Sequence, residues 1–146
     1  MASDPSTVAN ARCFIGMVNT GAAVGNVNPS TLTHMVGIGA DTGDANLQIM
    51  HNDGSGTATK VNLGSGFPAN TLSADAYEAF FTVANDGASI AYTVRNLCTG
   101  NTASGTISTD LPAAEKTLAP QLWRNNGTTA LAVNIDVMQF AVQTLD

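Results

Sequence analysis

Polar side chains suited to ligand binding gather in two short stretches of this 146-residue sequence. Asp41, Asp44 and Asn46 fall in the first stretch, and Asn52 and Asp53 form the second. Carboxylate and amide oxygens at alternating positions are the ligands that Ca²⁺ takes in proteins. Their spacing is not that of an EF-hand loop, and the same residue types also satisfy the backbone of ordinary turns. We therefore expect turn structure and no cofactor here, with Ca²⁺ as the alternative.

The only tryptophan, Trp123, is a candidate for sugar recognition. It precedes an Asn-Asn-Gly turn, so its ring is expected at the end of a strand, where it can stack on the apolar face of a sugar. The alternative is that it fills the core or a seam between subunits. The candidate ligand-binding residues are Trp123, Asp41, Asp44, Asn46, Asn52 and Asp53.

No set of residues has the spacing that catalysis requires. The sequence has no G-x-S-x-G elbow and no HExxH motif, and its only histidines are His34 and His51. Glycoside hydrolysis needs two positioned carboxylates, whereas the only glutamates, Glu78 and Glu115, are far apart in the chain. We predict no catalytic residues and a non-enzymatic role.

Charged residues make up only 11% of the chain, with eleven acids against five bases. Nucleic-acid binding requires a basic face, and the five bases are scattered singly, so nucleic acid and anionic membranes are not expected partners. No apolar run approaches the roughly 20 residues that span a bilayer. The N-terminus lacks the basic segment and apolar core of a secretion signal, which predicts synthesis in the cytosol.

Alternating apolar and polar residues, separated by tight-turn sequences, predict strands along most of the chain. Asp53-Gly54, Asp86-Gly87 and Asn126-Gly127 are turn signals because they allow positive φ at low cost. The expected fold is all-β, an antiparallel β-sandwich (jelly roll) with little or no helix. We expect a flexible leader at 1–11 and one sandwich domain at 12–146. The expected strands are 13–18, 34–39, 47–52, 57–63, 77–83, 89–97, 103–109, 118–124 and 130–143.

Two of these strands carry further information. In 13–18 both faces are apolar, so the outer face must be covered by a loop, an edge element or another subunit. In 130–143 the apolar residues change from odd to even positions, which predicts a bulge or bend near Val137 and Met138. Cys13 and Cys98 both lie in apolar, strand-like segments, so two buried reduced thiols are expected rather than a disulfide.

Several stretches together resemble a known family. They are Val36-Gly37-Ile38-Gly39-Ala40-Asp41, the run 51–60, Leu63-Gly64 through Phe67-Pro68, the run 89–96 and the closing hairpin at 118–145. From about Arg12 onward the chain resembles the lectin-like jelly-roll domains, of laminin-G and concanavalin-A type, found in bacteriophage tail fibres and tailspikes.

The resemblance implies a virion component, made in the host cytoplasm, that forms a homotrimer and contacts host-surface carbohydrate. The glucanase members of that superfamily carry an E-x-D-x-x-E motif, which is absent here, so the resemblance implies no enzyme activity. An autonomous carbohydrate-binding module is the alternative function, and a capsid decoration or neck protein differs from the leading hypothesis only in its location.

Overall fold

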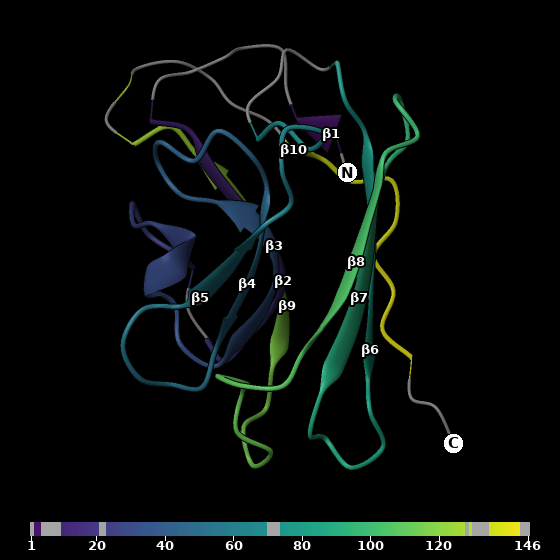
Figure 1. Cartoon of the computed structure of the whole chain (residues 1–146). Coiled ribbons are helices and arrows are strands. Elements are labelled where there is room, and N and C mark those ends of the chain that lie inside the picture. The colour runs from purple at the N-terminus through teal and green to yellow at the C-terminus, as the bar shows by residue number, and fades with distance from the viewer. Residues whose placement is uncertain are drawn as a thin grey trace.

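Short strands fold into two facing antiparallel sheets (Figure 1). The structure, a computed structural model, describes residues 2–3, 10–20, 23–69, 74–127, 129 and 135–143. The predicted all-β antiparallel sandwich is confirmed, and the one helical element among the described residues is a single 3₁₀ turn, η1. The elements are β1 Ala2–Ser3, β2 Arg12–Val18, η1 Pro29–Thr31, β3 Met35–Ala40, β4 Gln48–Asn52, β5 Thr59–Asn62, β6 Tyr77–Val83, β7 Ile90–Asn96, β8 Thr102–Ile107, β9 Ala119–Asn125 and β10 Ile135–Asp136.

The strand order shows how the chain builds the sandwich. The larger sheet has the order β5-β4-β3-β2-β9 and the smaller sheet the order β6-β7-β8, so consecutive strands form two meanders. The last long strand, β9, returns to pair with β2, as in a Greek key whose long connection is the whole smaller sheet. Gly54 and Gly87 both have positive φ, which confirms the turns predicted at those positions.

The predicted strand at 130–143 is wrong beyond Asp136, and residues 130–134 lie outside the described residues. Only Ile135–Asp136 is a strand there, and the chain bends at Met138, where the phase of the apolar pattern changes. One continuous strand cannot place both the odd-numbered and the even-numbered apolar residues on the same face of a sheet. The strand therefore ends where the pattern changes. β10 pairs with β1, which lies within the predicted leader, and the flexibility of that leader stays a prediction.

The core between the sheets is formed by the inward side chains of both. Ile49 from β4 and Val94 from β7 are completely buried there. The rest of this cluster includes Cys13, Val36, Ile38, Ala40, Leu47, Phe67, Tyr77, Ile90, Tyr92 and Ile107. Apolar burial of this kind is the main source of folding free energy.

A second apolar cluster covers the outer face of the larger sheet. The Phe14 ring lies over Gly16 and Gly37, where an added Cβ would come within 2.7 Å of the ring. Leu32, from the segment that contains η1, packs against the same cluster. This segment is held to the sheet edge by the Ala58 N–H, which donates to the Ser30 carbonyl oxygen at 2.7 Å. The two-faced apolar pattern of β2 is therefore explained by the chain's own loop, without another subunit.

Candidate binding surfaces

The first predicted polar stretch surrounds a lysine. Lys60 Nζ lies 3.0 Å from Asp41 Oδ2 and 2.9 Å from both carboxylate oxygens of Asp44. Partial burial alone would lower the pKa of Lys60, but the hydrogen bonds and charges of these two aspartates raise it overall. The ammonium group thus occupies the position between the carboxylates that the Ca²⁺ alternative assigned to a metal.

These same residues hold the η1 segment against the sheet. Asp41 Oδ1 accepts a hydrogen bond from the Ser30 N–H at 3.0 Å, and Thr42 N–H donates to Asn28 Oδ1 at 3.1 Å. Asn46 donates from Nδ2 to Asn62 Oδ1 on β5. The hydrogen bonds of this stretch therefore hold together β3, β5 and the loop that covers Phe14.

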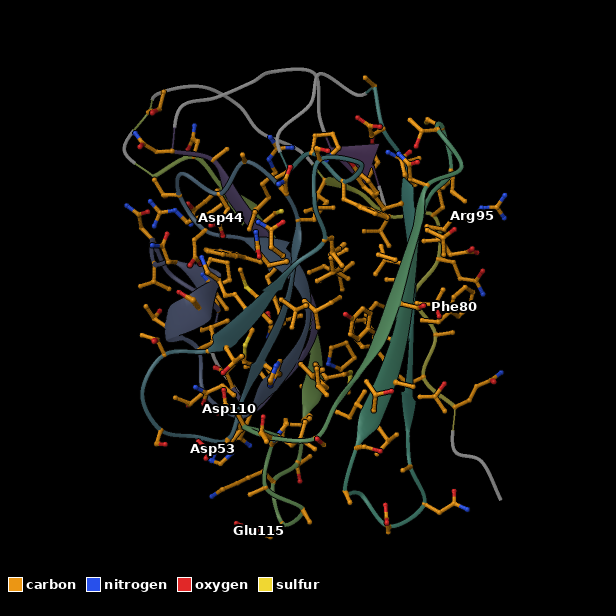
Figure 2. The ribbon with its side chains drawn as sticks, viewed as in Figure 1. Asp44, Asp53, Phe80, Arg95, Asp110 and Glu115 are labelled. Atoms are coloured by element: carbon orange, nitrogen blue, oxygen red, sulfur yellow. The ribbon has the colours of Figure 1, made fainter. Side chains whose placement is uncertain are left out.

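The second polar stretch lies at the opposite end of β4. Asn52 is completely buried, and its side chain bonds the backbone of Gly54 and Ser55. Asp53 accepts hydrogen bonds from Ser55 N–H and Oγ. Figure 2 shows Asp44 and Asp53 at different ends of the molecule. The fold does not bring the two predicted stretches together, since the length of β4 separates them.

Trp123 lies on β9, paired in register with Phe14. It is half-buried and packs against the outer cluster rather than beside the polar loops. Within the described part of the chain, no group of three His, Cys, Asp or Glu residues has the geometry to hold a metal ion. His51 is buried, and its Nδ1 donates to the Asp110 carbonyl oxygen at 3.1 Å.

The two cysteines have different environments. Cys13 is buried in the core between the sheets, and this burial raises the pKa of its thiol to about 11. Cys98 is exposed in the turn after β7, so the prediction that both thiols are buried is wrong for Cys98. Both cysteines are free. The alternating apolar residues Ile90, Tyr92 and Val94 belong to β7, and the strand ends at Asn96, before Leu97 and the cysteine.

Asp110 joins two loops at the lower end of the sandwich, where Figure 2 shows it near Asp53. Its Oδ1 accepts a hydrogen bond from the Asp53 N–H at 2.9 Å, and Oδ2 accepts one from the Thr59 N–H at 3.1 Å. Partial burial would raise the pKa of this carboxyl, but hydrogen bonds from Thr59 and Asp53 lower it overall. Sequence reasoning did not single out Asp110, because its partners are backbone groups about 50 residues away.

Asp110→Asn is expected to lower the free energy of unfolding by about 1–2 kcal/mol at pH 7, allowing for partial exposure. Asn tolerates the positive φ at this position, but its NH₂ group would face a backbone N–H. Because folding lowers the Asp110 pKa, its stabilisation is complete above the ordinary value of 3.8 and is lost as pH falls through the folded value. The difference between variant and wild type, from urea midpoints, should therefore shrink as the pH falls below 3.8. Glu115→Gln, at an exposed site, is the control, and a difference independent of pH would contradict the assignment.

Sequence reasoning missed the outer face of the smaller sheet. The strand registers place Glu78, Arg95 and Thr102 in one row, Phe80, Thr93 and Ser104 in the next, and Thr82, Ala91 and Thr106 in the third. All of these residues are exposed. Phe80, which is 59% exposed, lies midway along β6 (Figure 2). The signal in the sequence was a phenylalanine at a position where the alternation of β6 calls for a polar residue.

A long apolar groove lies beside β6. It is lined by inward residues of β2, by β6 itself and by residues 137–143. Ile15 and Met17 on β2 are only partly buried, and Leu122, which pairs with Ile15, is 40% exposed. The cause is the unequal size of the two sheets, because among the described residues five strands face only three. In this part of the chain, one side of the sandwich is therefore open.

Comparison with known proteins gives no relative: no family model, no curated protein and no solved structure matches this chain. Across the described residues there is also no helix with the length and apolar character to cross a membrane.

Proposed function

We propose that this chain is a non-enzymatic structural domain of a bacteriophage tail fibre or tailspike, which forms a homotrimer in the virion and contacts host-surface glycan. The observation that carries the proposal is the open apolar side of the sandwich. Contiguous apolar surface of this kind marks interaction sites on soluble proteins. Val83, Met138 and Val142 are all strongly exposed along it in the single chain.

The outer face of the smaller sheet supports the glycan-contact part of the proposal. Its one acid and one base, Glu78 and Arg95, stand opposite each other in register, and most of the remaining residues are Thr or Ser. Hydroxyl groups can donate and accept hydrogen bonds with sugar hydroxyls, and an exposed ring such as Phe80 can lie against the apolar face of a sugar. The same face favours the second candidate function, an autonomous carbohydrate-binding module. A capsid decoration or neck protein would use the same surfaces at another place in the particle.

The mass of the protein in solution separates these functions. At micromolar concentration, light scattering coupled to size exclusion is expected to give three times the mass of the 146-residue chain. The physical reason is that trimerisation removes the exposed apolar side chains along β6 from water. A strictly monomeric protein would contradict the proposal, and a monomer that binds immobilised glycan would favour the carbohydrate-binding module.

A further inference from the structure

The outer face of the smaller sheet has no net charge and is rich in hydroxyl groups. The registers of β6, β7 and β8 place three rows of three outward residues on it, and each of the nine is exposed. Among these nine, Ala91 and Phe80 are apolar, while Glu78 and Arg95 carry opposite charges and pair in register. The other five residues all carry a hydroxyl group: Thr82, Thr93, Thr102, Ser104 and Thr106.

Phe80 lies at one side of this hydroxyl-rich surface. Its row continues with Thr93 on β7 and Ser104 on β8, so one exposed ring is followed by two hydroxyl groups. Neighbouring strands lie about 4.8 Å apart, so the backbone positions of the row span about 10 Å. Phe80 is 59% exposed beside residues 137–143, which run past β6 on this side (Figure 1). The row is therefore accessible and short enough for one oligosaccharide to contact all three side chains.

This combination of side chains matches the two kinds of surface that a sugar presents. The CH groups of a sugar ring form an apolar face that packs against an aromatic ring, and sugar hydroxyls exchange hydrogen bonds with Thr and Ser. An acidic glycan would need basic partners. Among the nine residues the one base, Arg95, is offset by Glu78 directly opposite, and the whole chain has a formal net charge of −6. The charges therefore favour a neutral glycan over an acidic one.

We infer that the outer face of β6, β7 and β8 binds a neutral glycan. Phe80 stacks against a sugar ring, and the hydroxyl groups of Thr93 and Ser104 bond those of the glycan. The inference rests on the proposed glycan contact and names both the class of ligand and the surface that holds it. It also moves the expected sugar contact away from Trp123, which packs against the outer cluster of the larger sheet.

Binding to immobilised polysaccharides tests the class of ligand. The full-length chain is offered three neutral polymers (dextran, mannan and galactan) and two acidic ones (alginate and hyaluronan). At least one neutral polymer is expected to bind. Its apparent Kd should change less than about twofold between about 0.1 M and about 1 M NaCl, because salt screens only charge interactions. Binding of acidic polymers alone, or of none of the five, overturns the inference.

Two variants test the surface itself. Phe80→Ala should weaken binding of the neutral polymer about tenfold, because the stacking ring is removed. Thr93→Val keeps the shape of the side chain but removes its hydroxyl group, so binding should weaken about two- to tenfold. Val27→Ala and Thr57→Val are the matched controls at exposed positions outside this sheet, and both should bind as the wild type does.

The single tryptophan reports whether the glycan binds at the other sheet. Trp123 is the only tryptophan in the chain and lies on β9, in the larger sheet. Saturation with the neutral polymer should therefore leave its fluorescence emission unchanged. A shift of the emission on binding would place the glycan at Trp123 and overturn the inference.

The outcomes separate this inference from the proposed function. A trimer that binds a neutral glycan equally well after Phe80→Ala contradicts only the surface named here. A trimer that binds only acidic polymers contradicts only the class of ligand. A trimer that binds none of the five polymers contradicts the glycan contact and this inference together, while its mass still supports the proposed assembly.

Discussion

Asn96→Ala is expected to lower the free energy of unfolding by about 3–5 kcal/mol. Asn96 is completely buried at the end of β7. Its Nδ2 donates to the Gly66 carbonyl oxygen at 3.1 Å and to Asp75 Oδ1 at 2.7 Å, while its Oδ1 accepts from the N–H groups of Cys98 and Thr99. Alanine would leave these groups unpaired, including the buried carboxylate of Asp75. The loss is measured from urea or guanidinium unfolding followed by circular dichroism.

Two further variants test this explanation. Thr93→Ala, on the solvent side of the same strand, should cost less than about 1 kcal/mol. Asn96→Asp would place a second carboxylate against Asp75, so the protein should be strongly destabilised at pH 7 and regain stability as acid protonates one of the pair. If Asn96→Ala lowers the free energy of unfolding no more than Thr93→Ala does, the Asn96 amide does not hold the turn after β7 to the segments that contain Gly66 and Asp75.

Phe14→Ala is the second large effect, again with an expected loss of about 3–5 kcal/mol. The Phe14 side chain is 1% exposed, and it fills the space between the glycine positions of β2 and β3 and the loop that contains η1. Removing the ring leaves a cavity that the glycines cannot fill, because they have no side chains.

Phe80→Ala is the matched control, with the same change of residue at an exposed site. Its cost in unfolding free energy should stay below about 1 kcal/mol, provided both variants are unfolded at the same protein concentration. Equal losses for the two variants would mean that the outer cluster does not stabilise the sheet. A large loss for Phe14→Ala alone assigns the cluster a structural role.

Most of the strands could be predicted because their signal is local. Alternating burial in β7 follows directly from its sequence, and the glycines at positions 54 and 87 mark the turns between strands. The two-faced pattern of β2 correctly indicated a covered outer face. It did not identify the cover, because Leu32 and the η1 segment reach that face only through tertiary packing.

The candidate site was harder to predict from the sequence. The clusters at Asp41 and Asp53 are close in the chain, but a five-residue strand places them at opposite ends of the sheet. Lys60, the partner of Asp41 and Asp44, is a lone base in the sequence and gives no signal by itself. The exposed face around Phe80 depends on which side of β6 is turned outward and on how many strands oppose it.

The sequence by itself determined the all-β class, the scarcity of charge and the positions of most of the strands, because period-two alternation and turn chemistry act between near neighbours. Only the tertiary structure decided which surfaces are covered. The charge-poor chain buries Phe14 under its own loop, yet it leaves Phe80 and the inward side of β2 partly open. That difference arises because, among the residues that the structure describes, five strands oppose three, and the number of strands in each sheet depends on tertiary pairing.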